Sequence, residues 1–569
     1  MATMPKPQTE QLHFFRVSKD EAAAKADGEV FTQPWVVELI LDLTGYAATS
    51  DLAASVAVEP SCGQGAFFLP MLDRLIESCR THGKDIRSAT HALRATDLQP
   101  GNVEVTRRLA LARLVQCGVD PDTARSLVES WIRVGDYLLD PGTPSGADFV
   151  IGNPPYVRLE NIPDARCDAY RAACLTMRGR SDLFVGFIER GLRDLKPDGT
   201  LGFIVADRWM RNQYGADLRR FVGGSFSVEV VVEMHDVAAF EDDVAAYPAV
   251  VVIRRRAQGQ ARVARSTSAF GPDSARRLVR WHANPAASGL TADGIEGAVL
   301  DGWFRADEPW PTGTIEQLAV IAELESKLPA MGTAESSTRV GIGVATGADD
   351  LYLTRNPNQV EADRLLPVVM ASDVRTGSLQ WSGHYLVNPW KDGRLVDLSD
   401  YPKLAAYFDA NADRIRRRHT AVKNPARWFR TIDRVDPTLQ QRSKLLFPEM
   451  KATAHPVLDE GGYYPHHNLY AVTSDVWDLE TLGGLLLSDL ANLFIGAYCV
   501  RMRGGTMRFQ AQYLRRIRLP LPDAVTTTQA RELGRAFRQR DVGLATAVVA
   551  EVLKIDFARL IGVTQRRAA

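Results

Sequence analysis

The chain has 569 residues, which is too many for one ordinary hydrophobic core and indicates two or more domains. Hydrophobic residues make up 45% of the sequence and charged residues 24%, which excludes a mainly disordered chain. The 68 basic and 69 acidic residues nearly cancel, so any surface that binds nucleic acid must be a local one.

Short apolar segments alternate with amphipathic segments from about residue 28 to residue 256. Strands are predicted at 55–60, 91–97, 148–153, 200–206, 227–234 and 249–256. Helices are predicted at 67–80, 102–116 and 183–195. This alternation is typical of a doubly wound, mostly parallel α/β sheet.

The remainder of the chain has other patterns. Residues 257–313 are rich in Gly, Ala, Ser, Asp and Pro and are expected to have little regular structure. The predicted organisation is an N-terminal extension (1–27), a catalytic α/β domain (28–256), a connecting region (257–330), a separate α+β domain (331–525) and a helical tail (526–569).

The sequence shows no signal for a metal, a disulfide or a membrane span. The six cysteines are scattered, without a CxxC pair or a zinc-type cluster, which favours a reducing compartment. The N-terminus lacks the apolar core of a signal peptide. The apolar stretch 482–500 is interrupted by Asp489 and Asn492 and is expected to be a buried helix. We therefore expect a cytoplasmic protein.

The first candidate site is the segment VAVEPSCGQGAFF (56–68). Glu59 ends a predicted strand, and Gly63 and Gly65 lie in the turn into a helix. Glycines there let a ligand approach the backbone, and the start of the helix offers free N–H groups. The motif alone is common in α/β proteins.

Two further acids follow along the chain, the first at the end of the next predicted strand and the second after the next apolar stretch. Asp97, in TDLQP, is placed to accept hydrogen bonds from ribose hydroxyls, and Asp136, in RVGDYLLD, from an adenine amine. Each acid alone could cap a helix or a turn. Three in order, each where a strand gives way to a helix, indicate a site for a nucleoside-type cofactor. The chain has no GxxxxGK[ST] loop, which disfavours a phosphate-cradling nucleotidase.

The segment DFVIGNPPYVRLE (148–160) is the most informative. Its strand ends at Asn153, and Pro154 and Pro155 stiffen the loop that follows. The Asn153 side-chain oxygen and the Pro154 carbonyl can accept both N–H bonds of adenine N6, which favours a tetrahedral and nucleophilic nitrogen. Tyr156 can stack on the base. A proline-rich turn after a strand is the alternative for NPP alone.

With these motifs the chain resembles the gamma-class N6-adenine DNA methyltransferases of restriction-modification systems, of which TaqI is the familiar member, over almost its whole length. The resemblance includes GEVFTQPWVVELI, SDLFVGFIERGL and LKPDGTLGFIVADRWM, with Ala206 where the family usually has proline. It implies the class I S-adenosylmethionine-dependent methyltransferase fold with a C-terminal target-recognition domain, and S-adenosyl-L-methionine as cofactor.

The resemblance also implies residue roles. The cofactor-binding residues would be Thr32, Glu59, Ser61, Gly63, Asp97, Leu98, Asp136 and Tyr137. The catalytic residues would be Asn153, Pro154, Pro155, Tyr156 and Phe240. Within these sets Thr32 contacts the methionine part of the cofactor and Leu98 packs on its adenine. Phe240 is the second aromatic at the flipped base, with Tyr247 as the alternate.

The region RVGIGVATGADDLYLT (339–354) resembles the opening of the family's target-recognition domain. Two basic clusters lie in this domain, at 414–430 and 501–518, and indicate contacts with DNA phosphates and base edges; a solvated helix face is the alternative. Glu449 and Lys451 suit a nuclease, but are expected in a recognition-domain strand. The chain is expected to flip adenine and to hold double-stranded DNA between its two domains.

Three alternatives and two partner expectations complete the prediction. NPPY also occurs in methyltransferases of RNA and of protein glutamine, and a DNA-binding subunit could keep a vestigial cofactor fold. Cytosine-C5 chemistry needs a nucleophilic cysteine, and no cysteine here follows a proline as in that family. We expect a monomer that acts on DNA, with a cognate restriction endonuclease acting separately.

Overall fold

The computed structural model describes residues 30–140, 146–241, 247–300, 304, 306–501 and 506–555. The chain divides into two compact units, Met1–Pro309 and Trp310–Ala569. The predicted N-terminal extension and the end of the helical tail lie outside the described residues.

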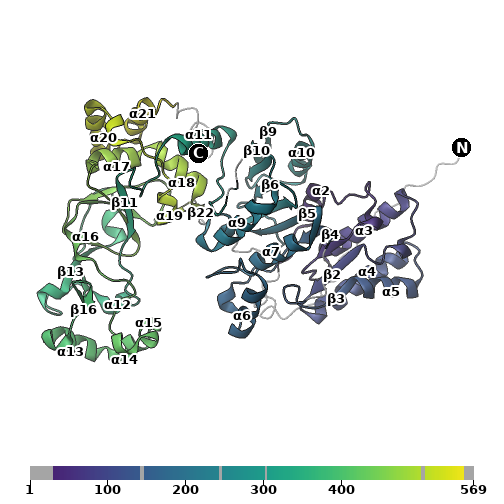
Figure 1. The fold of residues 1–569 in the computed structure, drawn as a ribbon, viewed down its shortest axis with the longest axis horizontal. Coiled ribbons are helices and arrows are strands. Elements are labelled where there is room, and N and C mark those ends of the chain that lie inside the picture. Colours follow the sequence, from purple (N-terminus) through teal and green to yellow (C-terminus); the bar gives the residue numbers. More distant parts are fainter. Residues whose placement is uncertain are drawn as a thin grey trace. The chain divides into compact units, whose positions relative to one another are not determined.

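The first unit is built on one large sheet (Figure 1). In the described residues its strand order is β3-β2-β1-β4-β5-β7-β6-β8-β10-β9. The strands are β1 (Ala57–Glu59), β2 (Leu93–Asp97), β3 (Ile132–Val134), β4 (Ala147–Gly152), β5 (Leu195–Ala206), β6 (Ser227–Glu233), β7 (Pro248–Arg254), β8 (Ala261–Ser266), β9 (Gly289–Ala292) and β10 (Ile295–Leu300). The pairs from β3 to β5 are parallel, and β7 is antiparallel to both β5 and β6. The six predicted strands and the mostly parallel sheet are confirmed.

Helices cover both faces of this sheet. They are α2 (Pro34–Thr44), α3 (Phe68–Thr81), α4 (Pro100–Gln116), α5 (Pro121–Trp131), α6 (Asp164–Ala173), α7 (Phe184–Asp194), α8 (Arg208–Arg211), α9 (Ala216–Ser225) and α10 (Pro272–Ala283). A Cβ at Gly202 of β5 would meet Thr44 of α2, whereas the neighbouring Leu201 contacts α7 at Gly191. Successive strand residues face opposite sides, so α2 and α7 lie on opposite faces of β5.

Residues 257–313 were expected to have little regular structure, and that expectation is wrong. β8 pairs with β6, and β10 and β9 extend the same sheet beyond residue 256, with α10 packed against α2. The misleading signal is the small residues: Gly297 of β10 lies under the ring of Trp281, where a Cβ would come within 2.9 Å of the ring. A strand that contains small residues to make room for a large neighbour has few apolar side chains. Its sequence therefore resembles that of a loop.

The second unit is α+β, with several small sheets. Its strands are β11 (Thr338–Ile342), β12 (Leu353–Thr354), β13 (Leu365–Val369), β14 (His384–Val387), β15 (Trp390–Lys391), β16 (Arg394–Leu395), β17 (Lys444–Pro448), β18 (Met450–Lys451), β19 (Val457–Asp459), β20 (Tyr464–Pro465), β21 (Leu469–Ser474), β22 (Val500–Arg501) and β23 (Met507–Arg508). Its helices are α11 (Ile315–Lys327), α12 (Asp349–Tyr352), α13 (Pro402–Ala410), α14 (Ala412–Arg416), α15 (His419–Lys423), α16 (Pro437–Gln441), α17 (Leu479–Leu487), α18 (Asp489–Tyr498), α19 (Ala511–Leu514), α20 (Thr527–Gln539) and α21 (Val542–Leu553). The predicted α+β character is confirmed.

Two helices predicted in this unit are each broken in two. The apolar stretch 482–500 forms α17 and α18, because the Ser488 hydroxyl caps a new helix by accepting the N–H of Leu490. The tail forms α20 and α21, because Arg540 takes a left-handed conformation with φ of 59°. Among the described residues no single helix is long and apolar enough to cross a membrane, although the bent pair α17 and α18 reaches that length and composition together.

Candidate active site

A cavity of about 250 Å³ lies in the first unit where several parallel strands end. Glu59 and Asp97 are the last residues of β1 and β2, Asp136 follows β3, and Asn153 follows β4. These four strands are neighbours in the sheet, so their carboxyl ends bring the four side chains to one edge. The predicted residues that line the cavity are Thr32, Glu59, Ser61, Gly63, Asp97, Leu98, Asp136, Tyr137, Asn153, Pro154 and Pro155.

The turn after β1 depends on glycine. Gly63 and Gly65 have φ values of 50° and 92°, in the left-handed region that disfavours other residues. The N–H of Gly63 donates to Oδ2 of Asp97 at 2.9 Å. This hydrogen bond connects the glycine turn to the end of β2, so two of the segments that line the cavity are fixed to each other by the protein itself.

Asp97 and Asp136 are both oriented by the protein. The other Asp97 oxygen, Oδ1, accepts from the N–H of Gln99 at 2.9 Å and from Nδ2 of Asn102 at 3.2 Å. Asp136 accepts from the N–H of Leu138 at 3.2 Å and from the Tyr170 hydroxyl at 2.8 Å. A carboxylate has about four acceptor positions, so each acid can still accept from a ligand.

Glu59 is the most deeply buried acid of the cavity, with 1% of its surface exposed. Its Oε2 is buried and has no hydrogen-bond partner among the described residues. Burial, and secondarily the charge of Asp97, raise the pKa of Glu59 well above its ordinary value. An isolated buried acceptor of this kind suits a cationic or hydrogen-donating ligand group.

Leu98 and Tyr137 present apolar surface to the cavity. Leu98 lines the cavity and is 47% exposed, so its side chain leaves apolar surface available to a planar ligand. Tyr137 is 2% exposed, and its hydroxyl donates to Asp194 at 2.9 Å, so only its ring is free to form part of the wall.

The side-chain amide of Asn153 has a defined orientation. Its Nδ2 donates to the carbonyl oxygen of Val30 at 3.0 Å and to Oγ1 of Thr32 at 3.1 Å. Because a carbonyl oxygen only accepts, the NH₂ group must face Val30. Oδ1 is left buried and without a partner in the described part of the chain. The loop is also held by the Ser61 hydroxyl, which donates to the Asn153 carbonyl at 3.2 Å.

Tyr156 lies beside the cavity, packed between two phenylalanines. Its ring centroid is 6.1 Å from that of Phe184 and 5.8 Å from that of Phe240, the latter nearly perpendicular at 81°. The Tyr156 hydroxyl is buried without a hydrogen-bond partner among the described residues, and burial raises its pKa. Tyr247, the alternate for Phe240, instead packs on His235 with ring centroids 5.1 Å apart.

Residues 31–33 connect the cavity to Phe240. Thr32 forms a backbone bridge with Phe240, the N–H of Gln33 donates to Ala239 at 3.0 Å, and that of Glu241 donates to Phe31 at 2.9 Å. Thr32 therefore lines the cavity, bonds Asn153 and pairs with the aromatic segment at once.

Some cavity residues were not anticipated from the sequence. They are Asn102 of α4, Arg166 and Tyr170 of α6, and Phe187 of α7. Arg166 and Tyr170 are four residues apart and so share one helix face, but nothing in their spacing pointed to Asp136, which both approach.

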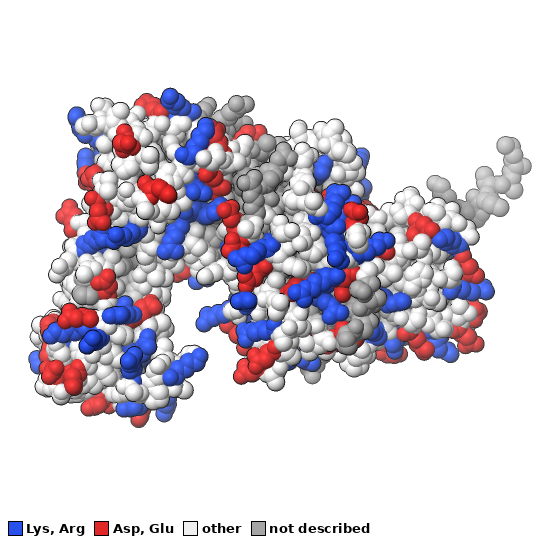
Figure 2. Space-filling view, in the orientation of Figure 1, with Lys and Arg blue, Asp and Glu red and all other residues white. Residues whose placement is uncertain are grey.

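In the second unit the first basic cluster divides into internal and exposed members. Arg418 donates to the carbonyls of Thr346, Trp428 and Arg430 at 2.8 to 3.0 Å, and Trp428 itself is buried. The exposed members are Arg414, Arg416, Arg417, Lys423 and Arg427. Figure 2 shows basic side chains gathered over the part of this unit where Figure 1 places α14 and α15.

Three arginines of the second basic cluster form ion pairs within this unit. Arg503 and the side chain of Arg501 lie outside the described residues, so contact of this cluster with DNA stays a prediction. Arg516 and Arg518 approach Glu325 at 2.8 and 3.7 Å, and Arg508 approaches Glu449 at 2.8 Å. The last pair also gives Glu449 a structural role, at the junction of β17 and β18.

Comparison with known proteins gives matches over the same segments of the chain. The family model described as Eco57I restriction-modification methylase matches residues 95–240, the span from Asp97 to Phe240. The chain is 42% identical over 507 residues to the type II methyltransferase M.XhoI of Xanthomonas vasicola, covering 87% of this chain and 91% of that protein. It is 42% identical to the type II methyltransferase M.PaeR7I of Pseudomonas aeruginosa, covering 92% and 91%.

A solved structure has the same fold. The type IIL restriction-modification enzyme MmeI, determined in complex with DNA, superposes with a TM-score of 0.54 at 12% identity, covering 94% of this chain and 77% of that one. The two proteins therefore share a fold.

Proposed function

The chain belongs to the type II restriction-modification DNA methyltransferases, and from that premise we propose that it transfers the methyl group of S-adenosylmethionine to the N6 amine of adenine in double-stranded DNA. The observation that carries this proposal is the Asn153 amide, whose Oδ1 is a fixed, buried acceptor without a donor at the edge of the cavity. An exocyclic amine is a group that can supply that donor.

The cavity suits S-adenosylmethionine in its acceptors and its shape. Oε2 of Glu59 suits the ammonium group, Asp97 the ribose hydroxyls and Asp136 the adenine amine, while Leu98 suits the face of the adenine ring. The cofactor supplies an electrophilic methyl on a sulfonium. The remaining chemistry concerns how the protein presents the amine.

The target adenine must leave the duplex to reach this pocket, because in the duplex its N6 amine is paired with thymine and its ring is stacked between neighbouring bases. Oδ1 of Asn153 and the Pro154 carbonyl then accept its two N–H bonds, and the nitrogen lone pair is freed from the ring. The N6–methyl bond forms as the sulfur–methyl bond breaks, and the proton that N6 then loses passes to water. No strong base is needed, because that proton becomes acidic only as the methyl transfers.

The positions of the Tyr156 and Phe240 rings support the proposal that the flipped base binds beside them. They meet edge to face beside the NPPY loop, and both belong to segments that touch Asn153 or Thr32. We assign Phe240, rather than Tyr247, as the second aromatic, since Tyr247 packs on His235. We further propose that the enzyme is a monomer and that its methylation protects host DNA from a separate endonuclease.

The test is to identify the methylated nucleoside. Purified protein is incubated with plasmid DNA and isotopically labelled S-adenosylmethionine, and the digested DNA is resolved by liquid chromatography and mass spectrometry. We expect label in N6-methyldeoxyadenosine alone, and none with Asn153→Ala. Label in a methylated cytidine would refute the adenine assignment, and label in RNA or a protein glutamine but not in DNA would favour those alternatives.

A further inference from the structure

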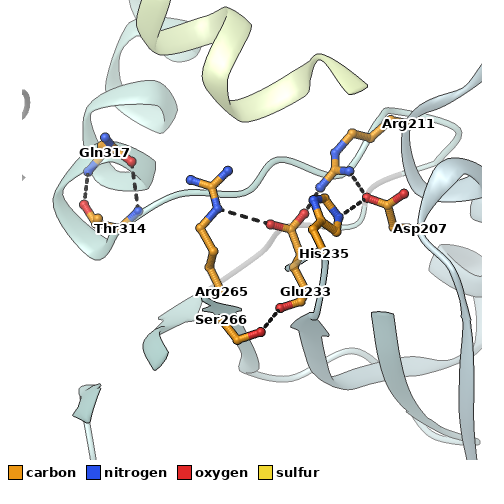
Figure 3. Close-up of polar contacts among 8 residues, drawn as sticks. All are labelled: Asp207, Arg211, Glu233, His235, Arg265, Ser266, Thr314 and Gln317. Carbon is orange, nitrogen blue, oxygen red and sulfur yellow. Dashed lines mark hydrogen bonds and ion pairs between the residues drawn. The ribbon is translucent and has the colours of Figure 1, made fainter. Parts of the chain in front are cut away.

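A buried ionic cluster lies at the edge of the sheet where β5 and β6 end and β7 begins (Figure 3). Its ionisable members are Asp207, Arg211, Glu233, His235 and Arg265. Asp207 and Glu233 are each 1% exposed, and Arg211 is 2% exposed. None of the five lines the cofactor cavity.

Charges in the interior are costly unless each is paired, so a buried ionic cluster is weak evidence for stability by itself. Burial would raise the pKa of Asp207, but Arg211 and His235 outweigh it and lower the pKa to about 2. Asp207 is therefore a carboxylate that depends on these two neighbours. What the arrangement holds in place is apparent from the backbone around it.

Asp207 contacts both ends of the loop between β6 and β7. At the beginning of the loop, His235 Nε2 lies 2.7 Å from Oδ2 of Asp207. At its end, the Asp207 N–H donates to the carbonyl of Tyr247 at 2.9 Å, and the ring of Tyr247 packs on that of His235. The N–H of Met234 also donates to Pro248 at 2.9 Å. The base of the loop is thus closed by His235, Tyr247 and Asp207.

This loop carries Phe240 between those ends. Its residues 239–241 pair with residues 31–33, and the Phe240 ring meets Tyr156 at 5.8 Å. The loop is therefore fixed at two places, at its base by the ionic cluster and near its middle by the segment that holds Asn153.

We propose that His235 is a positioning residue for the flipped base, which acts through Asp207 and the base of the loop to set Phe240 against Tyr156. The inference rests on the proposed function, because it concerns the pocket for the target adenine. His235 itself does not touch the cofactor cavity. Substitution of His235 should therefore slow methylation when base flipping costs free energy, and should have little effect when flipping is easy.

The experiment compares two DNA substrates in single-turnover methylation. In one the target adenine is paired with thymine, and in the other it lies opposite an abasic site, which lowers the cost of flipping. His235→Phe keeps a ring against Tyr247 but removes the hydrogen bond to Asp207, which still has Arg211 as partner. His235→Gln restores a donor at a similar reach. His91→Phe, at an exposed position, is the matched control.

We expect His235→Phe to slow methylation of paired DNA by about tenfold and to leave the abasic substrate within about twofold of wild type. His235→Gln should recover most of the rate, and cofactor affinity by calorimetry should be unchanged in both. Equal losses on the two substrates, no loss on either, or a parallel fall in cofactor affinity would each overturn the inference. Absence of N6-methyladenine with the wild-type protein would refute the proposed function instead.

Discussion

The Nδ2 of Asn153 donates to Oγ1 of Thr32 at 3.1 Å, and this contact joins the loop proposed for catalysis to the segment proposed to hold the cofactor. Thr32 is 4% exposed and also pairs with Phe240. Thr32 therefore helps to orient the Asn153 amide, lines the cavity and pairs with the segment that carries Phe240.

We predict that Asn153→Ala lowers the single-turnover methylation rate several hundredfold while cofactor affinity stays nearly unchanged. Oδ1 would be used most strongly as N6 becomes tetrahedral, and losing such a preorganised hydrogen bond costs on the order of 3–4 kcal/mol. Rapid-quench kinetics and calorimetry measure the two quantities. Near-normal transfer by this variant would contradict the mechanism.

Two substitutions of Thr32 test the orientation of the Asn153 amide more mildly. Thr32→Val removes the acceptor for Nδ2 at nearly constant volume, whereas Thr32→Ser keeps it. At saturating cofactor, the valine variant should transfer methyl about tenfold more slowly than the serine variant. Equal rates would show that the carbonyl of Val30 orients the amide alone.

We predict that Tyr156→Phe is mild and Tyr156→Ala severe. The hydroxyl has no hydrogen-bond partner among the described residues, so the phenylalanine variant keeps the ring and loses only an unpaired buried group. The alanine variant removes the ring that packs on Phe184 and Phe240. Fluorescence of 2-aminopurine at the target position, with single-turnover rates, measures trapping of the base. Equal damage from both substitutions would assign the role to the hydroxyl.

We predict that Asp97→Ala and Asp136→Ala each weaken S-adenosylmethionine binding by roughly tenfold or more. Each removes an acceptor, and an unpaired buried donor costs about 1–3 kcal/mol. Calorimetry on the two variants is the measurement, with Asp122→Ala, an exposed acid of α5, as control. Unchanged affinity in both would remove the cofactor assignment.

We predict that Glu59→Gln stabilises the cofactor-free protein and weakens cofactor binding. The pKa of Glu59 is raised in the folded state, so its contribution to stability is full below the unfolded pKa of about 4.3 and is lost as pH rises toward the folded value. The variant should therefore have the higher Tm at pH 7, and the difference should shrink toward pH 4. Thermal unfolding across that range measures it, and a lower Tm at pH 7 would show that Glu59 has a partner when folded.

We predict that Arg417→Ala with Lys423→Ala weakens DNA binding without loss of stability, whereas Arg418→Ala destabilises the second unit. Arg417 and Lys423 are exposed, and each lost phosphate contact should reduce the salt dependence of binding by about one unit of slope. Arg418 donates to four carbonyls and to the Tyr352 hydroxyl, so its loss should cost roughly 2–5 kcal/mol. Fluorescence anisotropy at several salt concentrations, with thermal unfolding, separates the two effects. Unchanged DNA affinity in the double variant would place the DNA surface elsewhere.

The sequence determined the parts of this protein that depend on local order along the chain. Apolar segments predicted six of the first seven strands, all but the short β3, because a buried parallel strand must be continuously apolar. The acids at 59, 97 and 136 and the NPPY motif could be placed together, since neighbouring parallel strands end at the same edge of a sheet.

Only the tertiary structure decided what depends on contacts between distant segments. The orientation of the Asn153 amide is set by residues more than a hundred positions away. The pairing of Phe240 with residues 31–33, which supports its proposed role over that of Tyr247, likewise joins distant segments. β10 was missed in part because its Gly297 has a packing role only in the fold, where it lies against the ring of Trp281. The division of the basic residues into Arg418 within the fold and Arg417 at the surface is likewise a matter of packing, since both have the same charge and neighbouring positions in the sequence.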